Sequence, residues 1–313
     1  MSIIVNKLFY LIIVLFSISI ITFGLIHLAP GDPAEIILRS FDSYTTEEAV
    51  ESLRDRIGTN DPVYIQYINW FYRIVQLDFG VSYQTGESVL VEILSRVPAT
   101  LELAVTSFIL TFLISFFLGI FSAIKKDSFF DHISRIGAII SISTPGFWLG
   151  LLLLYIFSVR YRIFPIMGRG GLINLVLPSV TLSLGLAGLY GRVFRSSIVD
   201  VLSQDYIKYA YAKGLSQSVV VLRHVLRNSV LPCITLLGIC FGNLLGGSAI
   251  VESIFAWPGV GKLALDAIFN RDYPIIMGYV LFMSIIFVLT NTIVDISYQL
   301  LDPRIRKGVR LKN

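Results

Sequence analysis

The chain has 313 residues, of which 55% are hydrophobic and only 15% are charged, and its mean hydropathy is +0.77. A soluble domain of this length carries charge on about a quarter of its residues, so the composition indicates an integral membrane protein. The net charge of +4 comes from Lys and Arg in loops between apolar runs, and gives no reason to propose a nucleic-acid partner.

Apolar runs of about 20 residues have the length of a membrane-crossing helix, and the sequence contains six. The expected spans are Leu8–Leu28, Leu103–Ile124, Ile136–Val159, Leu172–Tyr190, Val230–Ile250 and Ile275–Val294. The first run is too long for a signal-peptide core, so we expect it to remain as a helix. The predicted fold class is therefore an all-α membrane protein with six transmembrane helices.

Lys and Arg concentrate in residues 125–135, 192–227 and 304–312, and short loops rich in these residues stay in the cytoplasm. Both termini are therefore expected on the cytoplasmic side. The expected parts of the chain are the N-terminus with the first span (1–28), an outer insert (29–102), a membrane core (103–301) with a cytoplasmic loop (192–229), and a basic cytoplasmic tail (302–313).

The outer insert is acidic and contains two predicted helices. Thr46 is placed to cap a helix that reaches Arg56, and Asp61-Pro62 opens an amphipathic helix over Val63–Val75. The aromatic residues of the second helix suit a membrane interface, so we expect the insert to pack onto the outer rim of the bundle. A docking surface for a soluble binding protein is the alternative.

Polar or helix-breaking residues within or beside the spans are candidates for a transport path or gate. Pro145 interrupts the third span, and irregular backbone at membrane depth survives only inside protein or beside a water-filled cavity; a packing kink is the alternative. The remaining candidates are Asn243, Glu252 and Asn291, although Glu252 can equally be an outer capping carboxylate.

Neither the histidines nor the glycines specify chemistry. His27, His132 and His224 fall on opposite sides of the membrane and cannot share a metal; only His27, at the outer end of the first span, is open to an entering ion. No metal site is assigned. Glycines in the fifth span predict a close helix contact, which we hypothesise is with a second membrane subunit: Gly238, Gly242, Gly246 and Gly247.

The cytoplasmic stretch Asp205–Pro232 has the pattern of two short helices joined at Gly214, a residue that adopts the left-handed conformation at little cost. Ser216 is placed to cap the second helix, and Pro232 to open the fifth span. The predicted apolar positions are Ile207, Ala210 and Tyr211 in the first helix and Val220, Leu222, Val225 and Leu226 in the second. An amphipathic loop lying on lipid headgroups is the alternative.

This stretch resembles the coupling loop, or EAA loop, of permease subunits of ABC importers in the dipeptide, oligopeptide and nickel branch. The matching residues are Asp205-Tyr206, Ala210 to Leu215, Arg223 to Asn228 and Leu231-Pro232. The literal Glu-Ala-Ala triad is absent, since Lys208-Tyr209-Ala210 stands in its place, as is typical of this branch. Further matches include Leu77 to Ser82, Pro98 to Leu103, Phe255 to Lys262 and Asp302 to Arg306.

The resemblance implies a type I importer permease in the bacterial inner membrane that is not itself an enzyme. It implies a second permease subunit (a paralogue), two ATPase subunits that hold ATP and Mg²⁺, and an extracytoplasmic substrate-binding protein. The residues expected to couple to the ATPase are Tyr209, Ala210, Tyr211, Lys213, Gly214, Leu215 and Ser216.

Three functions compete at this stage. The closest resemblance is to the B-type permease of nickel importers, which implies transport of nickel or a nickel chelate. The same machine for di- or oligopeptides is the alternative, because the binding protein makes most of the selection. An ATP-independent channel or receptor is the third.

Overall fold

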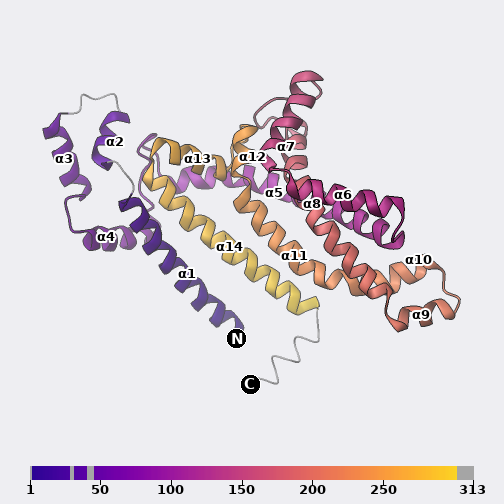
Figure 1. Cartoon of the computed structure of the whole chain (residues 1–313). Helices are drawn as coiled ribbons and strands as arrows, with labels where there is room; N and C mark the ends of the chain where they lie inside the picture. The colour runs from indigo at the N-terminus through magenta and orange to yellow at the C-terminus, as the bar shows by residue number, and fades with distance from the viewer. Residues whose placement is uncertain (1, 29–31, 41–45, 302–313) are drawn as a thin grey trace. The chain divides into compact units, whose positions relative to one another are not determined.

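A computed structural model describes residues 2–28, 32–40 and 46–301, with the side chains of residues 2–8, 39–40, 56–57, 230–235, 237, 247 and 295–301 excepted. The predicted basic tail, 302–313, lies outside the described residues, as do the side chains of Pro232 and Gly247. The described chain is helical and contains no strand (Figure 1). Its first helices are α1 (Ser2–His27), α2 (Pro33–Ser40), α3 (Glu47–Ile57), α4 (Val63–Val75), α5 (Val89–Ile124), α6 (Phe129–Ser143), α7 (Gly146–Leu153) and the π-helix η1 (Leu154–Arg160). The remainder are α8 (Leu172–Leu202), α9 (Asp205–Ala212), α10 (Gln217–Val220), the π-helix η2 (Val221–Val225), α11 (Leu226–Gly247), α12 (Ala249–Ile254), α13 (Val260–Asn270) and α14 (Tyr273–Leu301).

Within the described residues, four helices are long and apolar enough to cross a membrane, and a bent pair raises the number to five. The four contain Phe9–His27, Val89–Ile124, Leu172–Leu202 and Tyr273–Val294. The bent pair is Phe129–Ser143 with Gly146–Arg160, whose axes differ by 103°. The expected break at Pro145 is thus confirmed, and it is a sharp turn. The predicted fifth span, Val230–Ile250, coincides mostly with α11, which begins at Leu226, so the prediction that Pro232 opens this helix is wrong.

The helices form two compact units, of which the first comprises Met1–Thr100 and Pro258–Val288. Its core is an apolar cluster in which Val89 and Ile93 of α5 meet α13 and α14. Gly278 permits this approach, because a Cβ there would lie 2.5 Å from the Val89 side chain. The buried carboxylate of Asp272 accepts hydrogen bonds from Ser82 Oγ (2.5 Å) and the Tyr83 amide (3.2 Å), which fixes the chain between α4 and α5.

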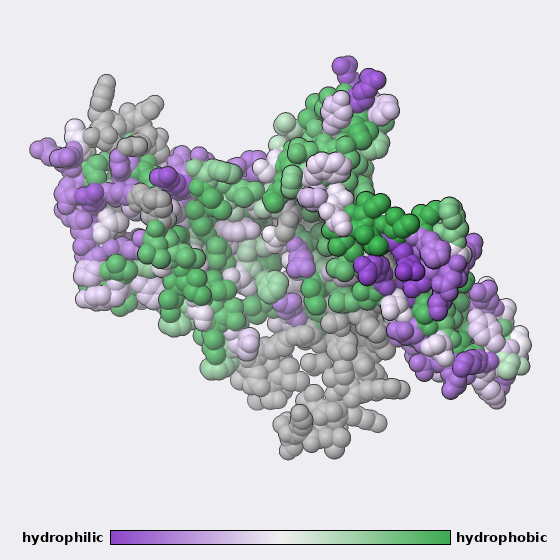
Figure 2. Space-filling model, viewed as in Figure 1, coloured by the Kyte–Doolittle hydropathy of each residue, from purple (hydrophilic) through white to green (hydrophobic). Residues whose placement is uncertain are grey.

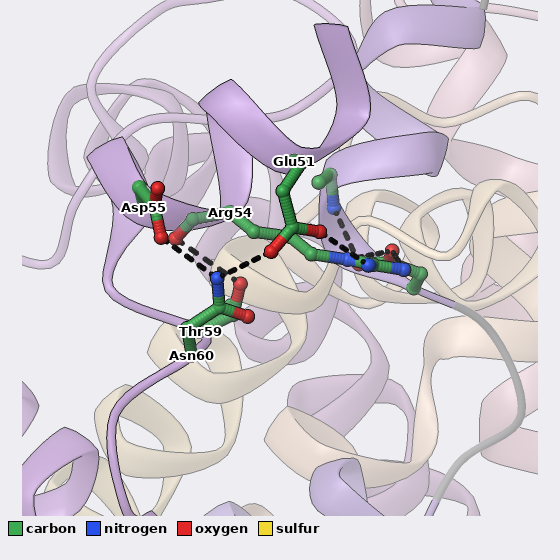
Figure 3. Close-up of polar contacts among 7 residues, drawn as sticks. Glu51, Arg54, Asp55, Thr59 and Asn60 are labelled. Atoms are coloured by element: carbon green, nitrogen blue, oxygen red, sulfur yellow. Dashed lines mark hydrogen bonds and ion pairs between the residues drawn. The ribbon is translucent and has the colours of Figure 1, made fainter. Parts of the chain in front are cut away.

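Two sequence predictions for the outer insert are confirmed. Thr46 Oγ1 accepts a hydrogen bond from the Ala49 amide (3.3 Å) and caps α3, and α4 spans Val63–Val75 as expected. A polar network then holds α3 in place (Figure 3). Arg54 binds Asp32 and Glu51 (2.7 and 2.8 Å), and Asn60 donates to Glu51 and Asp55 (3.0 and 2.7 Å). The hydrogen bond from Arg54 to Asp32 joins α3 to the start of α2.

The second unit comprises Leu101–Trp257 and the chain from Leu289 onward, with α8 in contact with α5, α6, α7 and α11. Glycines allow these helices to approach closely. A Cβ on Gly119 would lie 2.5 Å from Phe194 Cβ, and one on Gly188 would lie 2.9 Å from the Ala138 carbonyl oxygen. Because neither position has room for a side chain, α5 and α6 are each fixed against α8 at one register.

The surface carries the pattern expected of a membrane protein. Green apolar residues cover large areas over the long helices in Figure 2, whereas purple polar residues gather over α3 and over the region of α9 and α10. Exposed large side chains of α1 include Phe9, Ile12 and Phe16. These apolar surfaces are suited to lipid or to other subunits.

Candidate functional site

The candidate coupling segment, residues 205–229, folds mostly as helix rather than as an open loop. The α9 helix ends at Ala212, and Gly214 then adopts φ +81°, the left-handed conformation predicted from the sequence. The chain turns there and enters α10 and η2, which continue into α11. Ser216 is the N-cap residue of α10, as predicted, although its side chain makes no capping hydrogen bond.

One face of the coupling segment is buried in a core. Ile207 and Ala210 of α9 pack with a cluster contributed by α5, α8, α10 and η2: Ala123, Ile198, Val220 and Val225. Two predicted core positions are wrong. Leu222 is 66% exposed, because at about 100° per residue it lies opposite Val220, and the neighbouring Val221 is buried instead. Tyr211 is 40% exposed, so it lies at the edge of the buried face.

The opposite face of α9 is available for contact. The Tyr209 side chain is 62% exposed, and the Lys213 ammonium lies 4.7 Å from the centre of its ring. Lys208 binds Asp205 at 2.8 Å and lowers the pKa of that carboxyl below its usual value. Leu215, beside Gly214, is 37% exposed. Aromatic, apolar and cationic groups therefore share one small protruding surface, whereas Ala210 faces the core.

Two polar contacts join the coupling segment to the long helices. Asn228 Nδ2 in α11 donates to the Tyr206 hydroxyl in α9 (3.0 Å), and Ser197 Oγ in α8 donates to the Ser229 carbonyl oxygen (2.9 Å). With the buried cluster, these contacts connect α9 to both α8 and α11. A displacement of α9 therefore acts on two long helices.

A buried ion pair beside this cluster was missed by the sequence analysis. Arg195 of α8 donates from Nε and Nη2 to the two carboxylate oxygens of Asp131 in α6, both at 2.6 Å. Ser122 Oγ (2.5 Å) and the Asp127 amide (3.0 Å) complete the donors to this fully buried carboxylate. Ser128, whose side chain caps α6 three residues before Asp131, was the available signal. A bidentate pair of this kind holds α5, α6 and α8 together.

The four candidate path or gate residues do not form one exposed lining. Pro145 and Asn243 are exposed and Asn291 is half-buried, whereas Glu252 is fully buried in α12, where it accepts a hydrogen bond from Ser248 Oγ at 2.8 Å. The glycine face of α11 is also partly occupied, because a Cβ on Gly238 would lie 2.3 Å from the Val294 side chain of the same chain. At Gly246 the space is open.

His27 lines a cavity of about 760 Å³ in the first unit. Its ring stacks on Phe23, with 4.7 Å between ring centres. The cavity is also lined by charged groups of both signs, among them Arg73 and Asp78. No group of three or more His, Cys, Asp or Glu residues in the described part of the chain could hold a metal ion.

Comparison with known families covers almost all of the chain. A family described as the inner membrane component of binding-protein-dependent transport systems matches residues 115–307, and the N-terminal family of the same membrane components matches residues 1–104. Members are transport subunits and not enzymes, and the ATPase is a separate subunit. They reside in the inner membrane and work with partner subunits, ATPases and a binding protein.

Similar curated proteins include the glutathione transport system permease protein GsiC of Escherichia coli (strain K12) and of Shigella dysenteriae serotype 1. Each is 39% identical over 303 residues, covering 97% of this chain and 98% of the relative. The inward-facing MetNI methionine ABC transporter is a similar solved structure, with a TM-score of 0.59 and 18% identity over 68% of this chain and 97% of that one. This likeness supports the type I importer permease fold, and the relatives give no support to the nickel expectation. The family match over both parts of the chain and the 39% identity together establish that this protein belongs to the binding-protein-dependent permeases of ABC importers.

Proposed function

We propose that this permease carries short peptides of the size of glutathione across the membrane. The observation that carries the proposal is the 39% identity, over nearly the full length of both proteins, to permeases of glutathione transport systems. The peptide interpretation therefore takes the place of the nickel interpretation.

The proposed mechanism uses α9 as a lever. The exposed face of α9 around Tyr209 docks on an ATPase subunit in the cytoplasm, which requires the predicted orientation with both termini inside. Closure of the ATPase dimer on ATP and Mg²⁺ moves α9, and its contacts with α8 and α11 transmit the motion to the bundle. The cavity between this subunit and a paralogous permease then opens to the other side.

The exposed face of α9 supports this role through the side chains that it presents. Tyr209 and Tyr211 offer exposed aromatic surface, and the Lys213 ammonium lies over the Tyr209 ring. Exposed aromatic and cationic groups clustered at one protrusion are typical of a protein interface. The remaining coupling residues, Gly214, Leu215 and Ser216, form the turn that follows.

Uptake measurements in cells that lack this gene test the substrate class. Radiolabelled glutathione and dipeptides are compared with radioactive nickel, before and after the gene is restored. The proposal expects peptide uptake to return with the gene and nickel uptake to stay at the level of the deleted strain. Restoration of nickel uptake alone would contradict it.

A further inference from the structure

The α4 helix of the first unit has three distinct faces. The first, formed by Tyr67, Trp70, Phe71 and Ile74, packs towards α1 and the core cluster. The second, the polar face, consists of Gln66, Asn69 and Arg73. The third, the apolar face, consists of Tyr64, Ile68, Tyr72 and Val75, which are 66%, 60%, 66% and 67% exposed. At about 100° per residue the polar and apolar faces lie on opposite sides of the helix.

The polar face turns towards the cavity described above. Gln66 Nε2 donates to the carbonyl oxygens of Thr59 and Asp61 (3.0 and 2.7 Å), and Asn69 and Arg73 line the cavity together with acidic residues. This side of α4 is therefore adapted to water. Tyr64, Ile68 and Val75 of the apolar face do not line the cavity, whereas Tyr72 lies at the margin and does. The apolar face carries no charge, since Arg73 is the one charged residue of the helix.

The contacts of α4 with α1 show at which depth along the membrane-crossing helix α4 lies. Tyr67 hydroxyl lies 2.9 Å from Ser19 Oγ, and the rings of Phe71 and Phe16 meet edge to face with 6.0 Å between centres. Both partners belong to the membrane-crossing stretch Phe9–His27 of α1. At a rise of 1.5 Å per residue, Ser19 lies about 12 Å inside the His27 end of the helix. In Figure 1, α4 lies beside the half of α1 that is farther from the N-terminus.

The stretch of α1 between Ser19 and His27 supports the same depth for the lipid boundary. One side of this stretch faces polar groups, because Phe23, Ile26 and His27 line the cavity together with Asp32 and Arg54. Phe9 and Ile12, on the other side of Ser19, are exposed apolar residues, and so are Ile21 and Leu25 nearer to His27. Only the side of α1 that lines the cavity therefore changes to polar surroundings, and it does so where α4 packs.

We propose that α4 lies in the membrane interface, at the boundary between headgroups and acyl chains of the leaflet at the His27 end of α1. The apolar face contacts acyl chains, and the polar face looks towards the aqueous cavity. Helices of this type bury an uncharged face about 5–10 Å into the interface, with aromatic residues at the margin, as Tyr64 and Tyr72 are here. The insert is thus anchored in lipid and does not merely rest on the outer rim of the bundle. This role is independent of the transported substrate.

Spin labels on adjacent residues of α4 test the proposal. In a full-length chain with Cys233 and Cys240 replaced by alanine, Ile68→Cys and Asn69→Cys are labelled in the assembled importer in liposomes. Oxygen dissolves in acyl chains and chromium oxalate dissolves in water, so we compare how strongly each reagent relaxes the spin label. We expect oxygen to act severalfold more strongly than chromium oxalate at position 68, and the reverse at position 69.

Two results would overturn the proposal. If the label at 68 is as open to chromium oxalate as the label at 69, the apolar face lies in water. If the label at 68 is shielded from both reagents, another protein covers the face. Tyr64→Cys, on the same face, gives an independent measurement should the change at 68 disturb insertion.

Discussion

Breaking the Asp131–Arg195 ion pair should destabilise the second unit strongly, and the loss of stability should depend on which of the two residues is replaced. Asp131 is fully buried, whereas a fifth of the Arg195 side chain remains exposed. Removing one partner of a buried ion pair costs about 3–5 kcal/mol, because the other charge is left unpaired. The Arg195→Gln variant leaves the fully buried carboxylate unpaired, so its loss of unfolding free energy should lie at the upper end of this range, at about 5 kcal/mol. The Asp131→Asn variant leaves a guanidinium that reaches water, so its loss should be about 3 kcal/mol.

The free energy of unfolding of both single variants and the double variant, measured by denaturant titration in mixed micelles, forms the test. The double variant should lose less than the two single losses added together, by about 2 kcal/mol, because neither charge is then left alone. Its pull-down with the ATPase subunit serves as a check of assembly. Additive losses of less than about 1 kcal/mol each would show that the pair behaves as an exposed surface contact, and the reasoning would be refuted.

Three further predictions concern the coupling segment and the insert. Tyr209→Ala should change the free energy of unfolding by less than about 0.5 kcal/mol yet abolish co-purification of the ATPase subunit. Ile207 is fully buried, so Ile207→Ala should lower the free energy of unfolding by about 2–5 kcal/mol. Equal effects of the two substitutions on stability would contradict this. Gly214→Pro should leave insertion intact but abolish uptake and stimulated ATP hydrolysis, because proline cannot adopt φ +81°, whereas Gly214→Asn, which tolerates that conformation, should retain activity; normal uptake by the proline variant would refute the lever. Burial and the nearby Asp272 raise the pKa of Tyr83 from 10.0 to about 12, so the folded state favours the neutral phenol, and this contribution to stability is lost as the pH rises from 10.0 through about 12. Tyr83→Phe should therefore reduce the loss of unfolding free energy over this pH range. An unchanged dependence of the unfolding free energy on pH would contradict this.

Local signals allowed several elements to be predicted accurately. The Thr46 cap, the Asp61-Pro62 start of α4, the break at Pro145 and the left-handed Gly214 each depend on a residue and its near neighbours. Such features are fixed by backbone geometry and capping, which the sequence shows directly. The family resemblance, which depends on short motifs, was confirmed for the same reason.

Features that depend on contacts between distant residues could not be predicted in this way. Asp131 and Arg195 are 64 positions apart, and although Ser128 marks the start of α6, no neighbouring residue indicates that Asp131 pairs with Arg195. Leu222 was misplaced because exposure depends on which helix face meets a partner. The substrate class needed comparison with whole relatives, since the permease motifs are shared by peptide and nickel importers.

The central claim is that the exposed face of α9 contacts the ATPase subunit. Replacing Tyr209 with a photo-crosslinking amino acid in the assembled importer tests it most directly, and Tyr161, 65% exposed beyond η1, gives a matched control. The account predicts a covalent adduct with the ATPase subunit from position 209 and none from position 161. An adduct from position 161 of equal yield, or no adduct from position 209, would contradict it.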